Sequence, residues 1–366
     1  MASDRPISFA RGAPSLDIVD VDGLREAAEK AFTEDPGGTV AYGTAVGYVP
    51  LREWIAEQHG VEPSRVIVTN GSMQADAFLF DALVGPGQAV IVERPTYDRT
   101  LLSLKQRGAA VTAVELEHDG IDVSALERLL ADGLRPSLAH IIPNFQNPAG
   151  YTLSAPKREK LLALAAEHDF TIFEDDPYVA LRFEGEALPR MLEIDPEHVV
   201  YASSFSKTVC PGIRVGYLVG PPDLIDRIRV LATNTYISPS MVSESIVNQF
   251  CRSGAIDRSI ETVKSALQDR AAALASALGR ELPEARFVSP QGGYFMWVEL
   301  PEGADVEAIF AEAKARGVAI VKGTDFLMEG GENTFRLAYS GVTVPEIEEG
   351  VKRLAEAVRA AGGVAA

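Results

Sequence analysis

The chain has 366 residues, enough for two compact domains that each have a core of their own. Its net charge of −18 disfavours a nucleic-acid surface. No apolar stretch approaches the ~20 residues that would cross a membrane. Cys210 and Cys251 are too few for a disulfide framework or a zinc site, so we expect no metal and a reducing cytoplasm.

Between about residues 60 and 240, short β-branched runs alternate with longer amphipathic segments. The expected strands are 65–69, 89–93, 109–116, 137–143, 170–175, 198–204 and 215–220, and the helices between them are 73–84, 98–107, 123–132 and 155–168. This alternation predicts an α/β fold in which helices cover both faces of a mostly parallel sheet.

The remaining chain predicts a second, smaller unit. Residues 222–280 are typical of long helices that a polar run at 238–241 interrupts. Next come a helix at 305–317, strands at 318–321 and 334–340, and a terminal helix at 344–360. We expect a large domain over residues 36–250, a small α+β domain over 251–366, and an N-terminal segment, 1–35, that packs with the small domain.

The stretch SFSKTVCPGIR, residues 204–214, is the most informative. Lys207 has Ser204 and Ser206 before it and Arg214 seven positions after it. A lysine amine forms an imine with an aldehyde, and an arginine can hold a phosphate dianion. Pyridoxal phosphate needs both, although a lone lysine near serines is more often a solvated side chain.

Further polar residues follow predicted strands. Ser72 opens a helix in TNGSMQ, where it either holds a phosphate or is an ordinary helix cap. In IFEDDPY, Asp175 could pair with a pyridine nitrogen and Tyr178 could bond the ring oxygen, or they form a strand-end turn. Asn147 in PNFQNPAG could reach the same oxygen and the substrate carboxylate, and Tyr97 in RPTYD could stack on the ring or pack in the core.

Arg336 lies inside the otherwise apolar strand TFRLAYS. A guanidinium there is unfavourable unless it is paired, so it forms a structural ion pair or grips a carboxylate ligand. Fingerprints of dinucleotide, P-loop, zinc-protease and serine-hydrolase sites are absent from the sequence.

The ordered motifs AYGTAVGYVPLR, TNGSMQ, RPTYD, PNFQNPAG, EDDPY, SFSKTVCPGIR, QGGYFMW and FRLAYS resemble those of fold-type I, class I/II PLP-dependent aminotransferases. The resemblance covers nearly the whole chain and is greatest to the 2-aminoadipate/kynurenine aminotransferase branch. It implies the cofactor pyridoxal 5′-phosphate, a large domain with a mostly parallel sheet, a smaller α+β domain, and a homodimer with shared active sites.

By this resemblance, Lys207 forms the imine, Asp175 pairs with the pyridine nitrogen, and Asn147 and Tyr178 bond the ring oxygen. Tyr97 stacks on the ring, and Arg336 takes the substrate carboxylate. The phosphate is held by Ser72, the backbone at Met73, Ser204, Ser206, Arg214 and Tyr42 of the neighbouring subunit.

The chain also departs from the family pattern. Met73 stands where relatives have a second glutamine, Lys322 stands where a proline is common, and Arg11–Gly12 replaces the usual Gly-Gly. Gly12 belongs to the expected substrate site. We hypothesise that Arg11 beside it selects acidic or polar substrates, although it could equally point outward.

The expected activity is transfer of an amino group between an L-amino acid and a 2-oxo acid, with 2-oxoglutarate as the acceptor, by a ping-pong mechanism. A PLP-dependent lyase or cyclase would use the same residues and stays the main alternative. A PLP-sensing regulator would need a DNA-binding domain, which the acidic charge disfavours, and an α/β oxidoreductase would need the missing dinucleotide loop.

Overall fold

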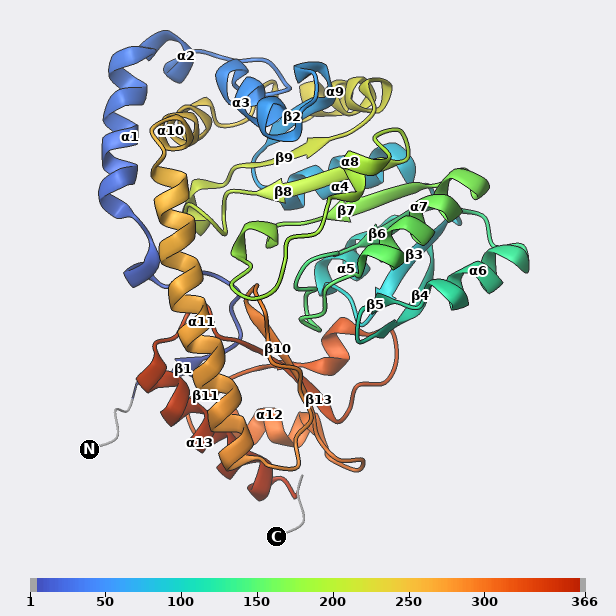
Figure 1. The fold of residues 1–366 in the computed structure, drawn as a ribbon, viewed down its shortest axis with the longest axis vertical. Coiled ribbons are helices and arrows are strands. Elements are labelled where there is room, and N and C mark those ends of the chain that lie inside the picture. The colour runs from blue at the N-terminus through green and yellow to red at the C-terminus, as the bar shows by residue number, and fades with distance from the viewer. Residues whose placement is uncertain (1–4, 363–366) are drawn as a thin grey trace.

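The computed structural model describes residues 5–362, and its largest element is an eight-stranded sheet (Figure 1). The strand order is β2-β9-β8-β7-β6-β3-β4-β5. The bounds are β2 (Val66–Thr69), β3 (Ala89–Arg94), β4 (Ala110–Glu117), β5 (Gly120–Ile121), β6 (Pro136–Ile141), β7 (Thr171–Asp175), β8 (Val199–Ser204) and β9 (Gly216–Val219). Strands β4, β3, β6, β7 and β8 run parallel, whereas β9 is antiparallel to β8 and β2, and β5 to β4. The predicted mostly parallel sheet is confirmed.

Helices cover both faces of this sheet because its strands alternate apolar side chains between the two faces. Ile172 of β7 packs into one core and its neighbour Phe173 into the other. The first core contains α3 (Val49–His59), α6 (Val123–Ala131), α7 (Ala155–His168), α8 (Met191–Ile194) and α10 (Met241–Arg252). The second contains α4 (Ser72–Leu83), α5 (Asp98–Gln106) and α9 (Pro222–Tyr236). Each fully buried aliphatic or aromatic side chain contributes roughly 1.5–3 kcal/mol to such a core.

The C-terminal unit is built on a smaller antiparallel sheet with the order β10-β13-β12. Its strands are β10 (Phe295–Glu299), β12 (Val321–Lys322) and β13 (Thr334–Ala338), and its helices are α11 (Ala255–Glu281), α12 (Val306–Ala315) and α13 (Val344–Ala360). These elements share one core. Helix α11 runs from the large sheet down to this unit, with α13 beside it (Figure 1).

The N-terminal segment divides between the two units. β1 (Ile7–Ser8) pairs with β11 (Val318–Ala319), so the start of the described chain packs on the C-terminal unit. In contrast, α1 (Val21–Glu34) lies along α10 (Figure 1). The expected packing of residues 1–35 with the small domain and the domain boundaries stay predictions. A short helix, α2 (Pro36–Val40), follows.

The strand expected at 318–321 is divided. Its first half, β11, pairs with β1, and its second half continues as β12, which pairs with β13. Five short 3₁₀ turns complete the structure: η1 (Leu16–Ile18), η2 (Pro63–Arg65), η3 (Val179–Leu181), η4 (Pro211–Ile213) and η5 (Gly323–Phe326).

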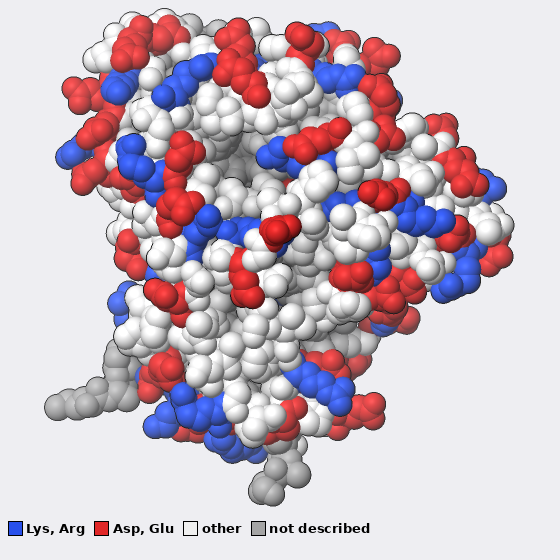
Figure 2. Space-filling view, viewed as in Figure 1, with Lys and Arg blue, Asp and Glu red and all other residues white. Residues whose placement is uncertain are grey.

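Acidic and basic side chains are interspersed over the face drawn in Figure 2. Helices of the described part of the chain are all too short or too polar to span a bilayer.

Candidate active site

The carboxyl ends of β3, β6, β7 and β8 meet at one edge of the sheet, beside β13 of the C-terminal unit. A cavity of about 820 Å³ lies there. Apart from Tyr42, every predicted site residue lines it: Arg11, Gly12, Ser72, Met73, Tyr97, Asn147, Asp175, Tyr178, Ser204, Ser206, Lys207, Arg214 and Arg336. Parallel strands bring these residues together because their carboxyl ends share one edge, where open α/β sheets bind ligands.

Lys207 lies in the turn after β8, and its amine points into this cavity. Nζ donates a hydrogen bond to the carbonyl of Gly12 at 2.8 Å and lies over the ring of Tyr178, 5.5 Å from its centroid. Burial, and then the positive charge of Arg336, lower the pKa of Lys207 to about 8. An amine with this pKa is partly neutral near physiological pH, as a nucleophile or a general base must be.

Near Lys207, the cavity also gathers donors for an anion. Arg214 Nη1 donates to Ser206 Oγ at 3.2 Å, and Ser204 Oγ accepts from the Ser206 amide at 3.2 Å. Ser72 begins α4, where the first backbone N–H groups have no partner within the helix. Gly71, at φ +89°, precedes it, and a Cβ there would collide with the Arg214 guanidinium. The arginine and the helix start therefore approach closely, which suits a phosphate.

Asp175 is the last residue of β7 and faces the cavity. Its carboxylate lies 3.3 Å from Nε2 of His140, which is fully buried on the neighbouring strand β6. The imidazole in turn packs against Phe173. Asp175 is thus held at the cavity wall by a ring that is itself packed in the core.

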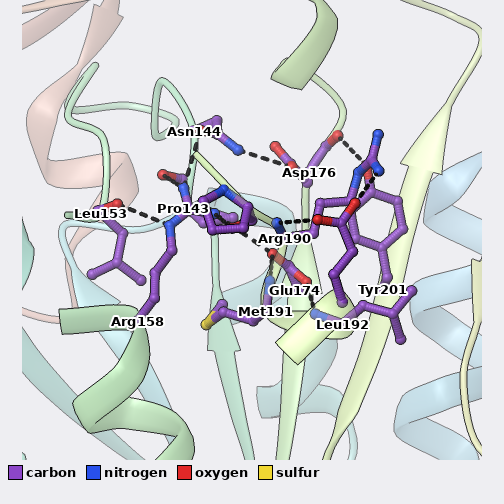
Figure 3. A network of polar contacts seen from close by, with 12 residues as sticks. Pro143, Asn144, Leu153, Arg158, Glu174, Asp176, Arg190, Met191, Leu192 and Tyr201 are labelled. Atoms are coloured by element: carbon purple, nitrogen blue, oxygen red, sulfur yellow. Dashed lines mark hydrogen bonds and ion pairs between the residues drawn. The ribbon is translucent and has the colours of Figure 1, made fainter. Parts of the chain in front are cut away.

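The residues on either side of Asp175 point to the opposite face of the sheet, into the network of polar contacts shown in Figure 3. Glu174 accepts hydrogen bonds from the amides of Met191 and Leu192, both at 2.9 Å. Asp176 accepts from Asn144 Nδ2 at 2.9 Å, and burial, followed by the charge of Glu174, raises its pKa to about 7.

Arg158 of α7 completes this network and connects two loops. Its Nη2 donates to the carbonyl of Pro143 at 3.3 Å and to Asn144 Oδ1 at 3.1 Å, and its Nε donates to the carbonyl of Leu153 at 3.0 Å (Figure 3). Nη1 lies 3.9 Å from the Glu174 carboxylate. The network therefore ties the end of β7 to the loop that carries Asn147.

Arg336 of β13 lies at the other side of the cavity with only 7% of its surface exposed. Nη1 donates to Asn147 Oδ1 at 2.8 Å, and Nη2 donates to the carbonyl of Ala10 at 2.7 Å. No carboxylate within residues 5–362 forms an ion pair with it, and Nε has no hydrogen-bond partner there. The structural ion pair considered as an alternative is thus wrong for the described chain.

Two tyrosines line the cavity. Tyr178 is buried, and burial, followed by the field of Tyr97, raises its pKa well above the ordinary value. Burial and then the charge of Asp98 raise the pKa of Tyr97 to about 12. Both phenols therefore stay protonated at neutral pH and can donate hydrogen bonds.

Three predicted residues lie at the rim of the site or outside it. Tyr42 is 87% exposed and lies in a shallow surface groove with Met241, away from the cavity. Arg11 is exposed at the cavity wall, and Met73 is half-exposed. The predicted role of each stays a prediction.

Sequence reasoning missed several residues of the cavity. Phe295 and Phe326 enclose the Arg336 guanidinium, with ring centroids 4.2 and 4.8 Å from Cζ. Asp76 of α4 also lines the wall. The available signal for Asp76 was a carboxylate within the otherwise apolar segment ADAFLF.

Comparison with known proteins identifies the family. The profile of "Aminotransferase class I and II" matches residues 5–354. The 2-aminoadipate transaminase of Thermus thermophilus is 34% identical over 359 residues, which cover 96% of this chain and 90% of that protein.

Solved structures agree with this match. The crystal structure of LysN, the α-aminoadipate aminotransferase of Thermus thermophilus complexed with N-(5′-phosphopyridoxyl)-L-leucine, has a TM-score of 0.93 and 33% identity, covering 97% of this chain and 92% of that one. The kynurenine aminotransferase of Pyrococcus horikoshii also has a TM-score of 0.93, with 31% identity and coverage of 98% and 92%.

The fold is that of the fold-type I PLP-dependent transferases. The chain belongs to the class I and II aminotransferases, and the predicted family and fold are confirmed. It is a PLP-dependent transaminase that exchanges an amino group between an amino acid and a 2-oxo acid. The cavity fits pyridoxal phosphate, since it combines a lysine of lowered pKa, an arginine beside a helix start, and a buried carboxylate.

Proposed function

We propose that Lys207 is the residue that bonds covalently to the cofactor and moves protons during the reaction. The observation that carries this proposal is the amine of lowered pKa inside the same cavity as an Arg336 that lacks a carboxylate partner within the described chain. One group supplies the nucleophile, and the other supplies a site for the α-carboxylate of an amino acid.

Each of the other residues contacts a different part of the cofactor. Bound pyridoxal phosphate supplies an aldehyde and an electron-accepting ring. With the cofactor bound, Asp175 would pair with the ring nitrogen, Asn147 and Tyr178 would bond the ring oxygen, and Tyr97 would stack on the ring. The groups that hold the phosphate are Ser72, the Met73 amide, Ser204, Ser206 and Arg214.

Arg336 binds and orients the amino acid. The planar guanidinium of Arg336 lies against the rings of Phe295 and Phe326. Its fork of donors can bind both oxygens of a carboxylate. Its existing bond to Asn147 Oδ1 connects the carboxylate site to the ring-oxygen site. Lys207 Nζ, when neutral, can then take the proton from Cα of the bound amino acid.

The substrate class that fits best is an acidic or polar amino acid, with 2-oxoglutarate as the acceptor. Arg11 adds a positive charge at the cavity wall, next to the Gly12 carbonyl that Lys207 contacts. Similar proteins are named for 2-aminoadipate and for kynurenine, which are both larger than alanine and carry polar side chains.

We further propose a homodimer in which Tyr42 reaches the partner's phosphate site. A tyrosine that is 87% exposed, with Val40 and Ile237 exposed as well, supports burial of this region by a second copy. The free thiols of Cys210 and Cys251 are compatible with a reducing cytoplasm.

The test is to add single amino acids to the yellow holoenzyme and follow its visible absorption, while quantifying pyridoxamine phosphate after acid release. 2-Aminoadipate and glutamate should bleach the band and give one equivalent of pyridoxamine phosphate, and 2-oxoglutarate should restore it. A lyase would instead release ammonia or a shortened product without stoichiometric pyridoxamine phosphate, and this outcome would overturn the proposal.

A further inference from the structure

Asp76 is a buried carboxyl that lines the cavity and has no part in the proposed cofactor and substrate contacts. It lies on α4 one turn after Ser72, and only 9% of its surface is exposed. Its Oδ1 has no hydrogen-bond partner among residues 5–362. Its neighbours on the helix, such as Ala75, Phe78 and Leu79, are core residues. A carboxyl in such a place is unfavourable for folding unless a ligand compensates it.

The side chain faces the same region as Asp175. Both residues line the cavity, and Asp175 points to the face of the sheet that α4 covers, since Phe173, two positions earlier, packs in the core that α4 shares. Burial, and then the negative charge of Asp175, raise the pKa of Asp76 well above its ordinary value. Both effects favour the protonated form of Asp76 in the free protein.

Titratable and charged groups on the elements around Asp76 include Asp175 on β7, His140 on β6, Glu93 on β3, Tyr97 before α5, Asp98 and Arg99 on α5, Lys207 after β8, Arg214 before β9 and Arg227 on α9. Arg227 bonds the carbonyl of Ala82 at the other end of α4. The negative charge of Asp175 is thus the one that raises the pKa of Asp76. Within the described chain, neither carboxyl forms an ion pair with a cation, except Asp175 with His140 when that imidazole is protonated.

We propose that Asp76 is a second cofactor-binding carboxyl, which holds a proton beside Asp175 in the free site and releases it to solvent when the positively charged pyridine ring binds. This inference rests on the proposed placement of the cofactor. Two close carboxyls disfavour double ionisation, whereas a cation between or beside them stabilises both charges. Asp76 would thereby strengthen retention of the ring proton, which makes the ring an electron acceptor.

The experiment is isothermal titration of the cofactor-free, full-length protein with pyridoxamine 5′-phosphate, which lacks the aldehyde that would react with Lys207. Titrations in buffers of different ionisation enthalpy give the number of protons released. The wild-type protein is compared with Asp76→Asn, with Asp76→Leu in case the first variant folds poorly, and with Asp81→Asn as a matched control. Asp81 is exposed on the same helix and pairs with Arg107 outside the cavity.

Wild type and Asp81→Asn should release about one proton more at pH 7.5 than either Asp76 variant. The Kd of the Asp76 variants should be weaker by about tenfold at pH 8.5, the equivalent of one pKa unit, and should approach the wild-type value at pH 6. A merely structural role would weaken binding by the same factor at both pH values.

Equal proton release and equal pH dependence in wild type and the Asp76 variants would overturn this inference and leave the cofactor site intact. Failure of the wild-type protein to bind pyridoxamine phosphate would instead overturn the proposed cofactor placement, and the role of Asp76 with it.

Discussion

Arg158 and Arg336 are both buried, but they differ in their partners. This difference distinguishes a residue that stabilises the fold from one that binds a ligand. Arg158 is fully buried, and its donors meet backbone carbonyls, Asn144 and the carboxylate of Glu174 (Figure 3). Arg336 is nearly as buried, but it lacks a carboxylate within the described chain and keeps Nε without a partner. A buried charge satisfied by the protein stabilises the fold, whereas an unsatisfied one indicates a ligand.

The largest expected effect is on stability, at Arg158. Arg158→Met leaves Glu174 buried without its cation, so the free energy of unfolding should fall by about 3–5 kcal/mol. Urea unfolding followed by circular dichroism measures this change. Arg135→Met is the control, because Arg135 is exposed and, among residues 5–362, bonds only the carbonyls of Leu130 and Leu134; its effect should stay within about 0.5 kcal/mol.

Arg336→Met should lower activity strongly and leave stability almost unchanged. Removal of an unpaired buried charge should leave the unfolding free energy unchanged or slightly higher. The loss of the carboxylate contact should lower kcat/KM for the amino donor by about a hundredfold or more, since truncating one partner of a buried charge pair costs about 2–5 kcal/mol. Steady-state kinetics and urea unfolding on the same preparation measure both. If Arg336→Met unfolded as readily as Arg158→Met, the comparison between the two arginines would be wrong.

The lowered pKa of Lys207 predicts a pH dependence. Only the neutral amine attacks an aldehyde, and with a pKa of about 8 its neutral fraction rises steeply between pH 7 and 9. The rate at which the cofactor-free protein recombines with pyridoxal phosphate should therefore rise by about tenfold over this range and then level off. Stopped-flow absorbance measures the rate. A continued rise to pH 10 or above would indicate a lysine of ordinary pKa.

Arg11 should give the smallest effect, because an exposed charge contributes only about 1 kcal/mol or less. Arg11→Ala should lower kcat/KM for glutamate relative to leucine by about fivefold or less. An unchanged ratio would show that the arginine points away from substrate.

The sequence alone was sufficient for the sheet and for most of the cavity, because both depend on local patterns. The strand that ends at Asp175 and the terminal helix 344–360 are recognisable from periodicity, and neighbouring parallel strands bring their ends together. Long-range pairing was not predictable in the same way. The division of 318–321 depends on β1, more than 300 residues away, and the position of α1 depends on α10.

The pairing of charges in the site also depends on long-range contacts, which local sequence patterns do not predict. TFRLAYS identifies Arg336 as a buried arginine, but its lack of a carboxylate becomes visible only when β13, the loop of Asn147 and the N-terminal segment are placed together. Asp76 stands out in the sequence as a carboxylate in an apolar helix, but only the structure shows that it reaches the cavity beside Asp175.

Borohydride reduction of the holoenzyme, followed by peptide mapping by mass spectrometry, identifies the lysine that carries the cofactor. We expect a phosphopyridoxyl group on the peptide that contains Lys207 and on no other lysine. Label at a different lysine, or an active enzyme whose Lys207 peptide carries none, would show that Lys207 does not hold the cofactor.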